Sequence, residues 1–195
     1  MPDPILIIIT GAPGTGKTTL GIRLASDFGL PFIYKDGIKE LLFDRLGWKQ
    51  DRQWSKTLSL ATYDLLFYFL ETLLKAGRSL IVEANFKAPN DAGKFLALRG
   101  RHPFQLIQIF CHAEREVLIE RFKQRAASPE RHPGHIDHLT QGEILESLAR
   151  NEYASLPITG QLLPVDTTDF TQFDYPALHS AVEAAMRQLS HEVTP

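Results

Sequence analysis

Hydrophobic residues form short continuous runs that alternate with longer amphipathic segments along this chain. Ile5 to Ile9 is an unbroken run of isoleucine and leucine, which is typical of a strand buried on both faces of a parallel sheet. Similar runs predict four more strands, at 32–34, 80–83, 104–111 and 162–165.

The segments between these runs have helical spacing. Residues 17–28 place apolar side chains at one- to three-residue intervals and end at Gly29, a typical helix stop. Further helices are predicted at 37–46, 54–76, 90–101, 114–127, 141–154 and 175–189. Strands that alternate with helices favour parallel pairing through right-handed crossovers. The expected fold class is therefore α/β, a three-layer sandwich around a five-stranded parallel sheet.

We expect one domain over residues 1–195, with a helical lid at about 121–140. The least regular stretch, 128–140, contains two prolines and a glycine between two predicted helices. An ordinary surface loop is the alternative there.

Composition limits the classes of function. The chain has 195 residues, 44% hydrophobic and 23% charged, so it can bury a core without disulfides or structural metal. Its net charge of −2 provides no overall positive field for a long nucleic acid. The single cysteine, Cys111, is expected to be a buried, inert thiol, which fits a reducing cytoplasm. The apolar run near the amino terminus is too short to span a membrane, so we expect a cytoplasmic protein without a membrane anchor.

A glycine-rich motif lies between the first strand and the first helix. It matches the phosphate-binding pattern Gly-x-x-x-x-Gly-Lys-[Ser/Thr] (Walker A) at every fixed position. The residues expected to contact a nucleotide here are Gly11, Ala12, Pro13, Gly14, Thr15, Gly16, Lys17, Thr18 and Thr19. Lys17 should reach the β- and γ-phosphates, and the Thr18 hydroxyl should ligate Mg²⁺. The motif predicts a nucleoside triphosphate site without specifying the fate of the γ-phosphate.

Acidic residues lie at the carboxyl ends of three predicted strands: Asp36 and Asp166 follow theirs, and Glu83 closes the strand at 80–83. Ligands of open α/β sheets gather at the carboxyl ends of the strands, so these acids are expected near the bound nucleotide.

The chain resembles small P-loop kinases of the polynucleotide kinase, chloramphenicol phosphotransferase and zeta-toxin type. The resemblance covers roughly residues 5–168 and is strongest in the phosphate loop, in 35–40 and in the arginine-rich stretch 120–135. It implies that Asp36 is the general base for the acceptor hydroxyl or orients it. Capping of a helix that begins at Gly37 is the alternative role for Asp36.

The resemblance also assigns the second acid and the lid. Glu83 stands where such proteins hold Mg²⁺, although a solvated strand end is the alternative. Arg121 and Arg125, four residues apart on a helix, and Arg131 beyond them match the lid arginines that stabilise the migrating phosphoryl group. A solvated helix face is the alternative for either of the first two arginines.

Thr167 and Thr168 resemble the segment that lies against adenine and ribose in these kinases, and a polar turn is the alternative. No Asn-Lys-x-Asp motif for guanine occurs in the chain, which favours ATP over GTP. The histidines of 131–138 match no zinc-binding spacing, so we favour a role in the lid.

The acceptor is expected between Asp36 and the long helix at 54–76. Aromatic residues at helical spacing are usually part of a core, but Trp48 and Trp54 are near a polar run and could stack on a flat acceptor. Lys39 stands where polynucleotide kinases have arginine, and lysine lacks the planar fork for bidentate phosphate binding. A nucleic-acid acceptor is therefore possible but not favoured.

The sequence as a whole predicts an ATP- and Mg²⁺-dependent phosphotransferase that acts on a hydroxyl of a small-molecule or nucleotide-like acceptor. A polynucleotide 5′-hydroxyl kinase and a non-catalytic ATP-binding switch are the alternatives. The sequence predicts neither the acceptor nor the oligomeric state.

Overall fold

The computed structural model describes residues 3–191, which form five strands and seven helices. The strands are β1 (Ile5–Thr10), β2 (Phe32–Tyr34), β3 (Leu80–Glu83), β4 (Gln105–His112) and β5 (Gln161–Asp166). The helices are α1 (Lys17–Phe28), α2 (Lys35–Leu46), α3 (Arg52–Lys75), α4 (Ala88–Arg101), α5 (Arg115–Ala127), α6 (Asp137–Ala149) and α7 (Tyr175–His191).

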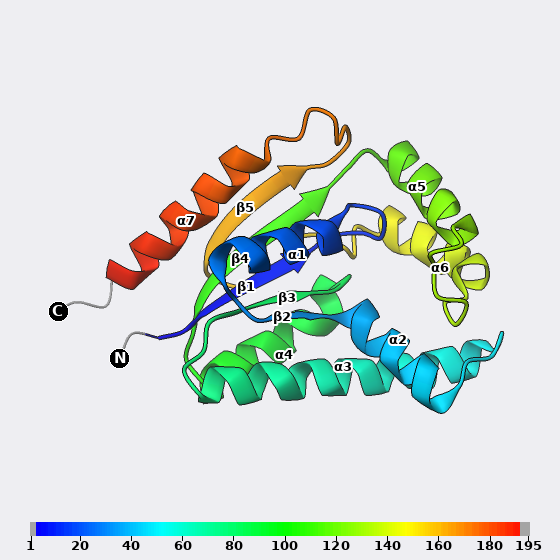
Figure 1. Ribbon diagram of the computed structural model, residues 1–195, viewed down its shortest axis with the longest axis horizontal. Helices are drawn as coiled ribbons and strands as arrows, with labels where there is room; N and C mark the ends of the chain where they lie inside the picture. The colour runs from blue at the N-terminus through cyan, green and yellow to red at the C-terminus, as the bar shows by residue number, and fades with distance from the viewer. Residues whose placement is uncertain (1–2, 192–195) are drawn as a thin grey trace.

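The strands form one parallel sheet in the order β2-β3-β1-β4-β5 (Figure 1). The central strand β1 pairs with β3 on one side and β4 on the other, so that Ile9 lies level with Glu83 and with Ile109. The predicted α/β fold with a five-stranded parallel sheet is confirmed.

The two faces of the sheet bury alternate residues of β1. Ile5, Ile7 and Ile9 belong to the core formed with α1 and α7, whereas Leu6 and Ile8 belong to the core formed with α3 and α4. Because successive side chains of a strand point to opposite faces, a strand covered on both sides must be apolar throughout. This explains the unbroken run in the sequence.

Several element boundaries differ from the prediction. Helix α2 begins at Lys35, directly after β2, so Asp36 lies in the first turn and Tyr34 occupies the capping position. The alternative role of Asp36 as the cap of a helix starting at Gly37 is therefore wrong. Helix α6 runs from Asp137 to Ala149 rather than over 141–154, because acidic Asp137 suits a first helical turn and is held there by Arg131. The irregular segment between α5 and α6 is therefore 128–136.

The carboxyl ends of the strands meet α2, α5 and α6, which lie beyond one end of the sheet (Figure 1). This arrangement gathers the phosphate loop, the strand-end acids and the arginines of α5 at the same edge. Within residues 3–191, no helix combines the length and apolarity needed to cross a membrane.

Candidate active site

The phosphate loop is shaped by glycines between β1 and α1. Gly11 and Gly16 have φ angles of 138° and 74°, and a Cβ at Gly11 would lie 2.0 Å from the carbonyl oxygen of Cys111. Only glycine fits so close an approach to another backbone segment. Gly16 precedes α1 without a side-chain cap, so the first amides of the helix remain available to an anion.

Lys17 folds back over this loop. Its Nζ donates hydrogen bonds to the Ala12 carbonyl oxygen (2.7 Å) and to Thr15 Oγ1 (3.3 Å), and only 4% of the residue is exposed. Burial lowers the pKa of Lys17, although the nearby Glu83 carboxylate opposes this effect. The ammonium thus lies inside the loop, held by neutral acceptors that phosphate oxygens can replace.

Thr18 and Glu83 meet at the carboxyl end of β3. Thr18 Oγ1 donates a hydrogen bond to Glu83 Oε2 at 2.8 Å, and Glu83 is 5% exposed. Burial raises the pKa of Glu83, which Lys17 partly offsets. An adjacent hydroxyl and carboxylate supply hard oxygen ligands. Both line the cavity beside the phosphate loop, called here the nucleotide cavity, so this pair fits Mg²⁺.

The nucleotide cavity has a volume of about 680 Å³ and includes Gly14, Gly16, Lys17, Thr18 and Thr19 in its wall. Arg121 and Phe170 also line it, with the Arg121 guanidinium 4.1 Å above the Phe170 ring centre. Stacked planar groups on the wall of a nucleotide cavity suit contact with a base.

Arg121 lies apart from the other two arginines. It donates hydrogen bonds to the backbone oxygens of Thr167 (2.7 Å) and Thr168 (3.0 Å). The Thr167 hydroxyl donates in turn to the His112 carbonyl oxygen, and the Thr168 hydroxyl accepts from the Glu114 amide. Both threonine hydroxyls are therefore hydrogen-bonded within the protein. The backbone carbonyl groups of the same two threonines hold Arg121 beside Phe170.

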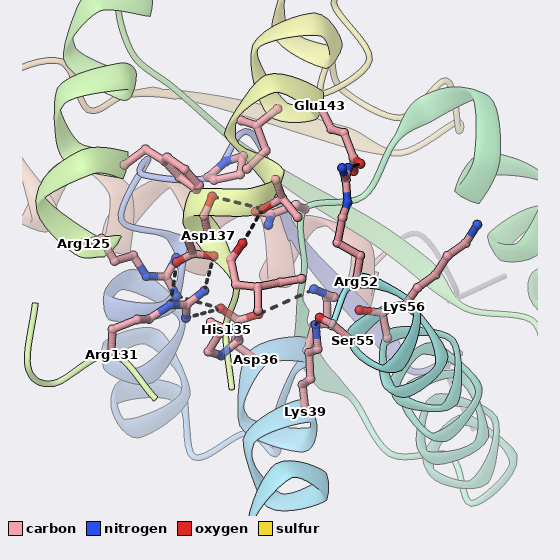
Figure 2. Close-up of a pocket in the computed structure, with 18 of the residues that line it drawn as sticks. Asp36, Lys39, Arg52, Ser55, Lys56, Arg125, Arg131, His135, Asp137 and Glu143 are labelled. Carbon is pink, nitrogen blue, oxygen red and sulfur yellow. Dashed lines mark hydrogen bonds and ion pairs between the residues drawn. The ribbon is translucent and has the colours of Figure 1, made fainter. Parts of the chain in front are cut away.

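Asp36 is surrounded by cations. Its Oδ2 accepts hydrogen bonds from Arg125 Nη2 (2.7 Å) and Arg131 Nη1 (3.0 Å) (Figure 2). Lys35 Nζ lies 3.6 Å from Oδ1. Burial alone would raise the pKa of Asp36, but these cations outweigh it and hold that pKa well below its usual value. Asp36 is thus an ionised carboxylate with one oxygen fully occupied.

The segment 128–136 is folded onto α2. Arg131 bridges from Asp36 to Asp137, with Nε 2.8 Å from Asp137 Oδ2. His135 Nε2 lies 2.8 Å from Glu40 Oε1, and burial lowers the pKa of His135 to about 3, so this imidazole is neutral at pH 7. His132 pairs separately with Asp44, at 3.2 Å.

A second cavity of about 600 Å³ is lined by α2, the first half of α3, and α6. This second cavity shares four residues with the nucleotide cavity: Lys35, Asp36, Asn85 and Arg125. Tyr63 lies on its wall, but neither predicted tryptophan does. Trp54 Nε1 instead donates to the Gly47 carbonyl oxygen, and Trp48 is 43% exposed. These two tryptophans therefore do not contact the second cavity, and their stacking on a flat acceptor stays a prediction.

Comparison with known proteins supports the P-loop α/β fold described above. A family model described as "AAA domain" matches residues 6–150. The chain belongs to this family. A search of curated protein sequences found no match to this chain.

Solved structures resemble this AAA domain protein along most of its length. A protein from Chloroflexus aurantiacus J-10-fl, described as a candidate kinase, is 41% identical, with a TM-score of 0.86 over 94% of this chain and 98% of its own. A sugar kinase from Janibacter sp. HTCC2649 is 16% identical (TM-score 0.59, 95% of each chain). A gluconokinase from Sinorhizobium meliloti 1021 is 18% identical (TM-score 0.54, 100% of each chain). The last two share the fold.

Sequence reasoning missed two parts of the site in this AAA domain. Phe170 gave no signal beyond an aromatic residue in a loop, and its role depends on where Arg121 stacks. Lys35 was noted only as part of the 35–40 segment, yet it borders both cavities. Its position next to Asp36, at the end of a strand, was the signal available.

Proposed function

We propose that this protein is an ATP- and Mg²⁺-dependent kinase that transfers the γ-phosphate to a hydroxyl of a small molecule bound between α2, α3 and α6. The observation that carries this proposal is the meeting of the two cavities at Asp36 and Arg125. A phosphate loop with only one cavity would suit a switch equally well. A second cavity that joins the first at an acid and an arginine supplies a place for an acceptor.

The phosphate loop and its neighbours hold the donor in this proposal. Lys17 moves from its neutral acceptors to the β- and γ-phosphate oxygens, and the α1 amides bind the same phosphates. Thr18 and Glu83 hold Mg²⁺, which when bound neutralises charge on the phosphates. Arg121 and Phe170 contact the adenine, and the backbone of Thr167 and Thr168 keeps Arg121 in place.

Asp36 orients the acceptor hydroxyl. Its Oδ2 is occupied by Arg125 and Arg131, which leaves Oδ1 to accept a hydrogen bond from the hydroxyl. The acceptor oxygen attacks the γ-phosphorus as the bond to ADP breaks, and the hydroxyl proton passes toward Asp36. Because its pKa is depressed, Asp36 is a weak base, so its main contribution is positioning. Arg125, which borders both cavities, stabilises the charge of the migrating group.

The 41% identical candidate kinase supports the kinase class, because it covers nearly the whole chain. The polynucleotide 5′-hydroxyl kinase and the ATP-binding switch make different predictions. Only the first would label short DNA or RNA, and the switch would bind ATP without transfer to any acceptor.

The test is a screen of metabolite pools for transfer of labelled γ-phosphate, with short oligonucleotides as a separate arm and the Lys17→Ala protein as blank. Once an acceptor is found, Asp36→Asn should keep the ATP affinity and lower kcat on the order of 100-fold or more, because the acceptor hydroxyl loses its partner.

Asp44→Asn is the matched control, since Asp44 lies on the same helix and contacts His132 on the lid. It should retain turnover. Equal turnover by Asp36→Asn would contradict the orienting role, and ATP binding without any transfer would favour the switch.

A further inference from the structure

Lys39 is a buried cation without an acidic partner among residues 3–191. It is 6% exposed, its Nζ donates a 3.0 Å hydrogen bond to Ser55 Oγ, and the ammonium lies 5.2 Å from the centre of the Phe43 ring. Burial and the neighbouring Lys35 lower its pKa to about 8. Asp36 and Asp137 stabilise the ammonium from a distance, but no carboxylate of the described residues forms an ion pair with it, so its charge is only partly compensated. Such a buried charge is unfavourable unless a ligand supplies the missing partner.

Both partners of this hydrogen bond line the second cavity. Figure 2 shows Lys39 reaching from α2 toward Ser55 on α3, on the same side of the cavity as Asp36. Lys39 lies three residues after Asp36, so one face of α2 presents a carboxylate and an ammonium to the same space.

The charges around the cavity are unbalanced. Seven lysines and arginines line it, against three carboxylates. Each carboxylate is already paired with an arginine: Asp36 with Arg125 and Arg131, Asp137 with Arg131, and Glu143 with Arg52. The chain as a whole has a net charge of −2, so the positive charge is a local property of this cavity. Lys87 is also paired, with Glu152 outside the lining, but the excess of positive charge remains. A cavity whose lining carries a net positive charge concentrates anionic ligands.

We propose that the phosphate acceptor carries an oxyanion, a carboxylate or a phosphate, that binds Lys39 Nζ and Ser55 Oγ while its hydroxyl faces Asp36. The proposal rests on the kinase function and deepens it by naming the substrate class: a hydroxy acid or a phosphorylated alcohol. Charge-assisted hydrogen bonds from an ammonium and a hydroxyl are a common way to hold such a group.

Geometry limits the size of this acceptor. Side chains three apart on a helix have Cβ atoms about 5–6 Å from each other. Lys39 Nζ and the Asp36 carboxylate line the same cavity, so one small molecule can meet both groups. The cavity volume of about 600 Å³ accommodates such a molecule.

The test compares matched pairs of acceptors by calorimetry on the full chain saturated with a non-hydrolysable ATP analogue and Mg²⁺. One arm pairs aldonic acids of three to six carbons with the alditols of the same length, and the other pairs alditol monophosphates with the same alditols. At least one anionic member should bind tenfold or more tightly than its neutral partner. The arm in which this occurs distinguishes carboxylate from phosphate.

Lys39→Met should remove this preference, because methionine fills a similar volume without charge, and Ser55→Ala should reduce it. Ser55→Ala also serves if the first variant folds poorly. Lys75→Met is the control, since Lys75 is exposed at the other end of α3, 20 residues or roughly 30 Å along the helix from Ser55. It should leave the preference unchanged.

Three results would overturn the proposal: no anionic member binds, the neutral partners bind as tightly, or the preference survives in both variants. The failure of the kinase function is separate, because ADP production with Mg²⁺-ATP is measured on the same panel. Anion binding that depends on Lys39 without any transfer would refute the kinase while leaving the anion site. Transfer to neutral alditols alone would support the kinase function and refute the anion site.

Discussion

Replacing Lys39 with methionine should stabilise the folded protein at pH 7. The ammonium of Lys39 is buried, and its pKa falls from an ordinary value of 10.5 to about 8. At about 1.4 kcal/mol per pKa unit, this shift corresponds to an unfavourable contribution of roughly 3 kcal/mol from the charged form. Removing the charge should therefore increase the free energy of unfolding.

Two favourable contacts of the ammonium reduce this gain. The hydrogen bond to Ser55 Oγ contributes about 1 kcal/mol, and the contact with the Phe43 ring on the order of 0.5–1 kcal/mol. The net stabilisation expected for Lys39→Met at pH 7 is thus about 1–2 kcal/mol.

The stabilisation should depend on pH in a defined direction. Below pH 8 the lysine is charged in both the folded and unfolded states, so the full difference is present. Between pH 8 and 10.5 the folded state releases its proton first, the unfolded state binds more protons, and the wild-type protein gains stability relative to the variant. The charged residues that act on Lys39 are Lys35, Asp36, Arg131 and Asp137. All four are present in both proteins, so the difference in pH dependence comes from residue 39 itself.

Urea unfolding at pH 7 and pH 9.5, with Lys75→Met as control, measures both quantities. The advantage of Lys39→Met should shrink from pH 7 to pH 9.5, whereas the control should stay near the wild type at both values. A variant that is less stable than wild type at pH 7, or whose advantage does not change with pH, would refute the reasoning. A less stable variant at pH 7 would mean that the contacts of Lys39 stabilise the fold by more than the burial of its charge destabilises it.

Two further variants test the donor side. Lys17→Ala should lower ATP affinity at least tenfold by calorimetry and abolish turnover, because the loop loses its only cation; unchanged affinity would remove the phosphate-loop assignment. Arg121→Ala should raise the KM for ATP several-fold with little change in kcat, as expected from losing stacking of about 0.5–2 kcal/mol over the base. A fall in kcat at constant KM would instead place Arg121 at the migrating phosphate.

Local pattern was enough to predict the fold and the phosphate loop between a strand and a helix. An isoleucine run buried on both faces indicates a central parallel strand, and the phosphate loop is continuous in sequence, so its glycines, Lys17 and Thr18 are already neighbours before folding. Boundaries were less accurate. Helix α2 begins at Lys35, directly after β2, and α6 begins at Asp137, which Arg131 holds from the loop just before the helix.

The lining of the second cavity was decided by tertiary structure. Arg121 and Arg125 are equivalent by helical spacing, yet one stacks on Phe170 and the other binds Asp36, 89 residues away. Lys39 has the same chemistry as any surface lysine until α3 packs against α2 and buries it beside Ser55. Charge, burial and distance between residues far apart in the chain determine these roles, and no local pattern encodes them. The sequence by itself thus determined the phosphate loop of a nucleoside triphosphate site, whereas packing determined which side chains line the second cavity.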